Sequence, residues 1–314
     1  MAEGRLAIAG AVALAACHGH REEGPPPLGK ALTALLAAAD SARAPWRCAA
    51  LDAPALPAEN VKVDGRTWAV GEHSVKLLAT RPELVIGVVG DAGGSAPGTL
   101  AALARLRTKL AGADLVVTLG GMGTTRAELE ATLGTLADHA SWPVVALPGD
   151  LEAEPAQIAA IATLRGKGDV VLDGRQARWI LLDGATLATL PGAGAAERLV
   201  AGPDGCSWRA GDVAAVYGEL AGKPGIRIAL ASEAPRAGGT GELPLVPAAA
   251  VDVVVHGAAP LTPARQGARD GRKADLSPGT ADASPRLPET RAPSAGLLLI
   301  HGNGWSWRPL VDGR

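Results

Sequence analysis

Four side chains able to bind a cation follow apolar stretches of buried-strand length: Asp91, Asp150, Glu233 and His256. In open α/β sheets, ligands bind at the carboxyl ends of the strands, which is where all four residues lie. Three carboxylates and one imidazole form a suitable ligand set for one Mg²⁺, Ca²⁺ or Mn²⁺ ion. One interpretation of these four residues is therefore a residual mononuclear metal site. The alternative is that the aspartates cap helices, the glutamate is solvated and the histidine is an ordinary loop residue.

Strands alternate with helices from Leu84 onward, and this alternation must position the four side chains. Apolar runs predict strands at 84–89, 114–119, 143–148, 226–231, 251–255 and 296–301. Apolar residues at helical spacing predict helices at 99–111, 124–140 and 156–167. Short runs at 170–172, 179–182 and 186–190, separated by Asp-Gly turns, predict a meander in a second sheet. Such alternation predicts crossover units in a layered α/β domain.

The first three strand ends carry altered forms of a known set of motifs. Asp91 is followed by Gly93, the second strand leads to Gly121, and the third leads to Gly149-Asp150-Leu151-Glu152. In order and spacing these ends resemble the calcineurin-type metallophosphoesterase family. In that family, Asp-x-His, Gly-Asp and Gly-Asn-His-Glu motifs supply metal ligands and a catalytic acid. The resemblance implies that several of these ligands are missing here.

The later motifs of the same family are also altered. Glu233 occupies the place of a metal-binding histidine, and Ala258 and Pro260 occupy the two histidine positions of a Gly-His-x-His motif. The resemblance covers most of the chain from Leu84 to its end. It implies an α/β fold, a two-sheet metallophosphoesterase-like αββα sandwich.

Loss of these ligands argues against two-metal catalysis, because glycine, leucine, alanine and proline side chains donate no electron pair to a metal. We therefore assign no catalytic residue, expect no cofactor, and predict a noncatalytic binding or scaffold protein. The alternative is a phosphoric ester hydrolase with a non-standard one-metal site (Mn, Mg or Ca) at the four residues named first. A further alternative is a metal-free phosphate cradle made by the backbone amides of Gly93, Gly94 and 120–123.

The N-terminus predicts export and lipidation. Residues 6–16 form an apolar run too short to span a bilayer, as expected for a signal peptide over 1–16. It ends in Leu14-Ala15-Ala16-Cys17, which is similar to the bacterial lipobox. That similarity implies that Cys17 is lipidated and anchors the protein to the cell envelope. With His18 next, it implies the outer membrane of a Gram-negative bacterium. The alternative is an alanine-rich helix of a cytoplasmic protein.

Cysteine content and net charge limit which cross-links and which partners the sequence predicts. If Cys17 is acylated, Cys48 and Cys206 remain, and an oxidising compartment would allow either a disulfide or two separate thiols. The net charge of −2 provides no basic surface for nucleic acid. The predicted partners are the lipid bilayer and an envelope protein.

The rest of the chain divides into segments of different composition. Residues 17–27 are polar and proline-rich and predict a tether. Residues 28–83 predict an N-terminal extension made of a helix and a hairpin that turns at Asp64-Gly65. The main domain is predicted over 84–314, with a disordered insertion at 261–294 because few large apolar side chains occur there. The alternative is that this insertion docks on an anionic partner or covers the site.

Overall fold

The computed structural model describes residues 45–235, 243, 250–257, 266–269, 273–283 and 292–312. The chain divides into the units Met1–Ala44 and Pro45–Arg314, and every described residue belongs to the second unit. Five predictions therefore concern residues outside the described part: the signal peptide 1–16, the Cys17 anchor, the tether 17–27, the helix at 28–39, and Ala258 and Pro260 at the two histidine positions. Within the described residues, no helix combines the length and apolar character needed to cross a bilayer.

One sheet has six strands in the order β17-β16-β5-β6-β7-β8. Its parallel part consists of β5 (Glu83–Val89), β6 (Leu115–Leu119), β7 (Val144–Leu147) and β8 (Val171–Asp173). Two antiparallel strands, β16 (Ser294–His301) and β17 (Gly304–Val311), complete it. Strands β6 to β8 are buried along their whole length, since both faces of this part of the sheet are covered.

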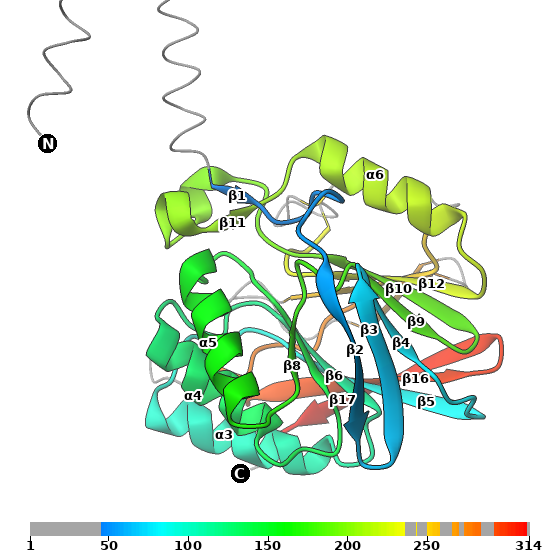
Figure 1. Ribbon diagram of the computed structural model, residues 1–314, viewed down its shortest axis with the longest axis horizontal. Helices are drawn as coiled ribbons and strands as arrows, with labels where there is room; N and C mark the ends of the chain where they lie inside the picture. The colour runs from blue at the N-terminus through cyan, green and yellow to red at the C-terminus, as the bar shows by residue number, and fades with distance from the viewer. Residues whose placement is uncertain are drawn as a thin grey trace, which may run out of the picture. The chain divides into compact units, whose positions relative to one another are not determined.

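Three crossover helices lie together beside this sheet (Figure 1). They are α3 (Pro97–Lys109), α4 (Arg126–Ala137) and α5 (Glu154–Gly166). Their buried leucines, such as Leu106, Leu133 and Leu164, form one apolar cluster with the outer face of the sheet. Helix α4 begins with a capping box in which Thr125 and Glu128 satisfy each other's backbone N–H groups.

The second sheet has nine strands in the order β14-β15-β13-β12-β10-β9-β4-β3-β2. Their bounds are β2 (Leu56–Val63), β3 (Arg66–Glu72), β4 (Ser74–Leu77), β9 (Trp179–Leu182), β10 (Ala185–Leu190), β12 (Ile226–Ala231), β13 (Val253–His256), β14 (Gln266–Arg269) and β15 (Lys273–Leu276). Strands β10, β12, β13 and β15 run parallel. Helix α6 (Ala210–Ala221) packs on the outer face through residues such as Val216 and Leu220.

The main core lies between the two sheets. Ile86, Val117 and Val145 of the six-stranded sheet belong to the same buried cluster as Ile180 and Ile228 of the nine-stranded sheet. With α3 to α5 on one outer face and α6 on the other, the layers run helix, sheet, sheet, helix. The prediction of an α/β sandwich is confirmed at this level of description.

The predicted domain boundary at residue 84 is wrong. Strands β2, β3 and β4 are part of the nine-stranded sheet, and Val75 of β4 lies in register with Ile180 of β9. Trp68 of β3 is fully buried in the main core. The predicted turn at Asp64-Gly65 is confirmed, with positive φ angles of 47° and 73° at its two residues.

Other elements differ from the sequence prediction as well. Strand β8 was expected in the second sheet, but it follows the α5 crossover and pairs parallel with β7. Helix α6 and strand β17 were not predicted. A short ladder joins β1 (Trp46–Arg47) to β11 (Cys206–Ser207), and two 3₁₀ turns, η1 (Ala196–Arg198) and η2 (Gly202–Asp204), precede β11.

The prediction of a disordered insertion over 261–294 is wrong for its described parts. Strand β15 extends the parallel part of the nine-stranded sheet beside β13, and β14 pairs with it. Leu276 lies in the main core, and Thr280 is buried. The low content of apolar side chains misled the prediction, because backbone hydrogen bonds to the sheet hold this segment.

Cys48 and Cys206 form a disulfide, one of the two alternatives left open by the sequence, with their Cα atoms 5.4 Å apart. The bond joins the segments of β1 and β11. Both side chains are buried, with 3% and 0% exposure.

Candidate functional site

Loops from both sheets meet at the carboxyl ends of their parallel strands. The Ser232 hydroxyl, after β12, donates a hydrogen bond of 2.8 Å to the carbonyl of Pro148, after β7. The N–H of Gly192, after β10, donates to the same carbonyl at 2.8 Å. A Cβ on Gly257, after β13, would lie 2.9 Å from the carbonyl oxygen of Leu119, at the end of β6. These contacts join the two sheets at this edge.

Asp91, after β5, is an acid with a strongly perturbed pKa at this edge. Its Oδ1 accepts the N–H of Gly93 at 3.0 Å. Burial raises the pKa of Asp91 to about 7, and the negative charges of Asp150, Asp282 and Glu152 add to the shift, while the Gly93 hydrogen bond opposes it. Asp91 is thus a carboxyl group able to exchange a proton near neutral pH, a property common at functional sites.

Two glycines around Asp91 leave no room for side chains. Gly121 has a φ of 73°, and a Cβ there would lie 2.5 Å from Oδ1 of Asp91. Gly93 has a φ of 63°, and its Cβ would lie 2.7 Å from Oδ2 of Asp282. The carboxylate of Asp282 therefore fills the space next to Gly93, the position at which the resembling family has a histidine.

Asp282 reaches this place because its segment binds the Asp91 loop. The backbone carbonyl of Asp91 accepts the hydroxyl of Thr280 at 2.7 Å and the N–H of Ala281 at 2.7 Å. Oδ1 of Asp282 accepts the Thr99 hydroxyl at 3.3 Å. Residues 280–282 thus lie against the site, in agreement with the alternative that part of the 261–294 insertion covers it.

Three of the six backbone amides proposed as a phosphate cradle, those of Gly93, Gly121 and Met122, already have acceptors. The fully buried carboxylate of Glu152 accepts the N–H of Met122 at 2.6 Å and the N–H of Gly149 at 2.7 Å. Burial raises the pKa of Glu152, and backbone hydrogen bonds, including one from Gly121, oppose the shift. The N–H of Gly93 is also used, by the carbonyl of Gly121 at 2.9 Å. The carboxylate of Glu152 therefore already accepts two of the amides that a bound phosphate would need, those of Gly121 and Met122.

Asp150 and Glu233 share a guanidinium. Nη1 of Arg198, in η1, contacts Oε1 of Glu233, and Nη2 lies 3.7 Å from Oδ2 of Asp150. The other oxygen of Glu233 accepts the N–H of Gly194 at 2.9 Å. The Glu233 side chain is only 5% exposed, whereas that of Arg198 is 35% exposed. Arg198 thus supplies a positive charge between two of the predicted metal ligands.

The four predicted ligands do not form a compact ligand group. Nδ1 of His256 lies 2.9 Å from its neighbouring carbonyl, that of Gly257. In the part of the chain that the structure describes, one group of three or more His, Cys, Asp and Glu side chains has its ligand atoms all within 4.8 Å of one another, and it is Cys48, Glu154 and Cys206. Metal binding by Asp91, Asp150, Glu233 and His256 stays a prediction.

Sequence reasoning missed Arg198 and Asp282. Neither belongs to a motif, and Asp282 lies in a segment with few large apolar side chains. No local signal in the sequence marks either residue, because each reaches the site through contacts between distant segments. Together with Asp91, they give this edge a cluster of acids, one proton-exchanging carboxyl group and one built-in cation.

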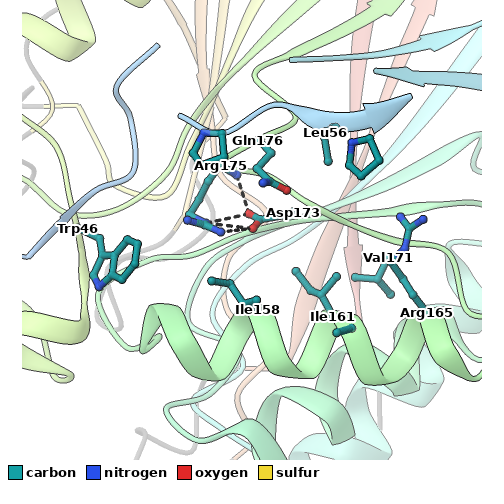
Figure 2. Close-up of a pocket in the computed structure, with 12 residues that line it drawn as sticks. Trp46, Leu56, Ile158, Ile161, Arg165, Val171, Asp173, Arg175 and Gln176 are labelled. Carbon is teal, nitrogen blue, oxygen red and sulfur yellow. Dashed lines mark hydrogen bonds and ion pairs between the residues drawn. The ribbon is translucent and has the colours of Figure 1, made fainter. Parts of the chain in front are cut away.

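A separate cavity of about 410 Å³ lies between α5 and the edge strands β2 and β8. Figure 2 shows Trp46, Leu56, Ile158, Ile161 and Val171 around it. The two guanidiniums that line it are paired, Arg165 with Glu59 and Arg175 with Asp173. The lining of the cavity is therefore mainly apolar.

No protein-family model matches the chain, and no curated protein matches it significantly. Similar solved structures exist at low identity. The TT1561 protein of Thermus thermophilus has 15% identity and a TM-score of 0.45, covering 72% of this chain and 98% of its own. GAP50, the anchor in the inner membrane complex of Plasmodium, has 11% identity and a TM-score of 0.49. The match covers 74% of this chain and 85% of the GAP50 chain. A hypothetical protein from Thermus thermophilus has 11% identity and a TM-score of 0.41. The match covers 73% of this chain and 100% of that protein's chain.

Proposed function

We propose that this chain is a noncatalytic binding or scaffold protein on a calcineurin-like metallophosphoesterase framework, held at the cell envelope by lipidated Cys17. The carboxyl edge of the two sheets would be its binding surface, and an envelope protein its partner. The noncatalytic part of the proposal depends most on one observation, the pairing of Arg198 with Glu233 and Asp150.

A guanidinium in this place opposes metal binding electrostatically. A divalent cation would have to approach a fixed positive charge, and Glu233 would have to exchange its paired cation for the ion. A metal-dependent hydrolase needs the opposite arrangement, with carboxylates free to hold an ion that activates water. The contact of Arg198 with the nearly buried Glu233 therefore favours a protein that binds a partner over a metal-dependent catalyst.

The glycines at 93 and 121 support the same proposal. A ligand side chain at position 121 would collide with Asp91, and one at position 93 would collide with Asp282. Restoring the family's ligands would thus require movement of two loops as well as new side chains. The packing around Asp91 and Asp282 therefore leaves no space for side chains at positions 93 and 121.

The test is an assay of the purified full-length chain on phosphomonoesters and phosphodiesters with added Mn²⁺, beside an Asp91→Ala variant. We expect both proteins to show the same background rate. Turnover by the unchanged chain that Asp91→Ala abolishes would overturn the proposal, because contaminating enzymes are unaffected by that substitution.

The second candidate is a metal-dependent phosphoric ester hydrolase with one ion. It is favoured by Asp91, whose pKa is raised to about 7 beside Asp150 and Asp282, since a bound cation would relieve this repulsion. Elemental analysis of the purified protein distinguishes the candidates. About one tightly held Mn, Mg or Ca per chain, lost in Asp91→Ala, would support the hydrolase.

A further inference from the structure

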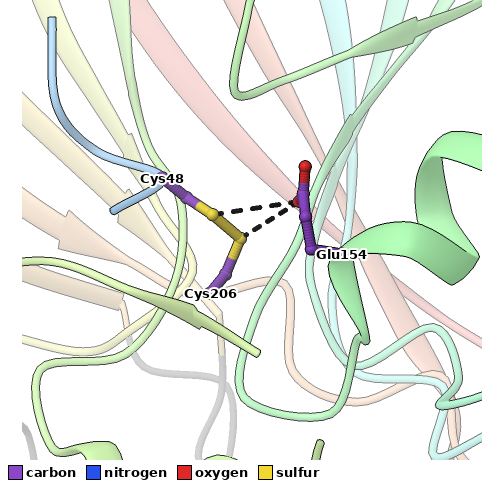
Figure 3. A group of neighbouring side chains, drawn as sticks. All are labelled: Cys48, Glu154 and Cys206. Carbon is purple, nitrogen blue, oxygen red and sulfur yellow. Dashed lines mark hydrogen bonds between the residues drawn. A yellow bond between two sulfur atoms is a disulfide. The ribbon is translucent and has the colours of Figure 1, made fainter. Parts of the chain in front are cut away.

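Glu154 is a fully buried carboxylate that faces the disulfide (Figure 3). Its Oε2 lies 3.5 Å from Sγ of Cys206 and 3.9 Å from Sγ of Cys48. Disulfide sulfur atoms carry no hydrogen, so neither sulfur donates a hydrogen bond to this oxygen. A fully buried carboxyl group whose Oε2 faces two sulfur atoms calls for an explanation.

The spacing of these three atoms matches a metal-ligand set. A tetrahedral zinc ion with typical Zn–S and Zn–O bonds separates its sulfur and oxygen ligands by about 3.6 Å. The two observed sulfur–oxygen distances, 3.5 and 3.9 Å, lie on either side of this value. Only the two sulfur atoms would have to move apart, to about 3.8 Å, once the bond between them is reduced.

The surroundings of Glu154 hold its carboxylate toward the sulfur atoms. Oε1 pairs with Arg175, and Arg175 is itself held by Asp173, whose oxygens accept its Nε at 3.0 and 3.1 Å. Such outer partners orient ligating carboxylates in metal sites. Arg175 contacts Oε1, and Oε2 is directed at the two sulfur atoms.

The backbone at Cys48 is also fixed independently of the disulfide. Arg178, which is buried, donates hydrogen bonds to the carbonyls of Cys48 at 3.1 Å and Ala49 at 2.9 Å. Replacing the disulfide by two thiolates and a divalent cation leaves the net charge of this region unchanged.

We propose that, when reduced, Cys48 and Cys206 join Glu154 in a binding site for a thiophilic divalent cation of the zinc class. The disulfide and the metal are then alternative cross-links between the segments of β1 and β11. The three protein ligands leave one position for water or another small ligand. The argument for this site does not depend on the function proposed above.

The test refolds the full-length chain with a phosphine reductant and titrates it with Co²⁺, a spectroscopic probe for zinc. Reduction is balanced: the phosphine gains the oxygen of one water molecule, and the two hydrogens of that water protonate the sulfur atoms. Binding of Co²⁺ then releases both thiol protons and, below about pH 8, the proton held by Glu154. We expect one Co²⁺ per reduced chain with thiolate-to-cobalt charge-transfer absorption, displaced by Zn²⁺, and none for the disulfide form.

Substitutions make the test specific. Cys206→Ser should weaken the charge-transfer band strongly, and Glu154→Gln should keep a thiolate band but weaken binding by at least about tenfold. The exposed Glu197→Gln serves as the matched control and should bind as the unchanged chain does. Circular dichroism confirms that each reduced protein is folded. A folded, reduced chain without the cobalt band, or equal affinity in Glu154→Gln and Glu197→Gln, would overturn the proposal.

Discussion

Nη1 of Arg198 contacts Oε1 of Glu233 at the point where strands of both sheets end, and this ion pair joins η1 to the loop after β12. The carboxylate of Glu233 is almost fully buried, so its charge depends on Arg198 and on the N–H of Gly194. The pair replaces the cation that the sequence predicted beside Glu233 with a side chain of the protein itself.

Removal of this guanidinium should destabilise the fold and uncover the acids. We expect Arg198→Ala to lower the free energy of unfolding by about 2–3 kcal/mol, less than for a fully buried pair because Arg198 is partly exposed. Millimolar Ca²⁺ or Mn²⁺ should then raise the melting temperature of the variant more than that of the unchanged chain. Urea denaturation and thermal scans measure both effects.

The control for this prediction is the double variant Arg198→Ala with Glu233→Gln. This variant also lacks the negative charge of Glu233, so it should recover stability and lose the response to cations. Equal stability of Arg198→Ala and the unchanged chain would show that the ion pair contributes nothing.

Asp91 should make stability depend on pH. Its folded pKa of about 7 lies above the ordinary value of 3.8, so ionisation disfavours the folded state. The stability penalty from ionised Asp91 is therefore absent below about pH 4, grows as the pH rises, and is complete above about pH 7. The substitution Asp91→Asn removes this penalty. Between these pH values, the free energy of unfolding of the variant should exceed that of the unchanged chain by on the order of 1–3 kcal/mol.

Urea denaturation from pH 4 to 8 on both proteins checks this expectation. The difference between the two isolates Asp91 from other buried acids such as Glu154, whose pKa is also raised. Parallel stability curves for the two proteins would mean that Asp91 has an ordinary pKa.

Gly121 should be intolerant of any side chain. Its φ is 73°, and an added Cβ would lie 2.8 Å from the Cα of Asp91 as well as close to its carboxylate. We expect Gly121→Ala to cost roughly 2–4 kcal/mol of stability, from backbone strain and from overpacking. Denaturant unfolding measures this loss.

Two other glycines separate these causes. Gly112 has a φ of 93° but open space around it, and Gly218 in α6 has open space and no positive φ. Gly112→Ala should therefore cost about 1 kcal/mol, and Gly218→Ala should be neutral or stabilising. If Gly121→Ala is no worse than Gly112→Ala, the close approach to Asp91 has no energetic effect.

Cys17 should carry lipid in a Gram-negative host. Expression of the full chain with a labelled fatty acid should label the protein and place it in the membrane fraction, because several acyl chains hold a domain stably on a bilayer. Cys17→Ser should abolish both. Label retained in Cys17→Ser would contradict the lipobox interpretation.

Local patterns predicted the elements much better than the side-chain contacts of the site. The strands and helices from β5 to α5 lie within a few residues of their predicted ranges, because hydrophobic periodicity and turn residues act over short distances. Helix α6 was missed despite its buried Val216 and Leu220, and the chain around β15 was misjudged from its composition.

The amino-acid order by itself determined that strands alternate with helices and that Asp91, Asp150, Glu233 and His256 lie at or near strand ends. Only the tertiary structure decided which charges meet there. Arg198 reaches Glu233 across 35 residues, and Thr280 reaches the Asp91 carbonyl across 189. Such contacts depend on the packing of whole sheets, and no pattern within a short stretch of sequence encodes them.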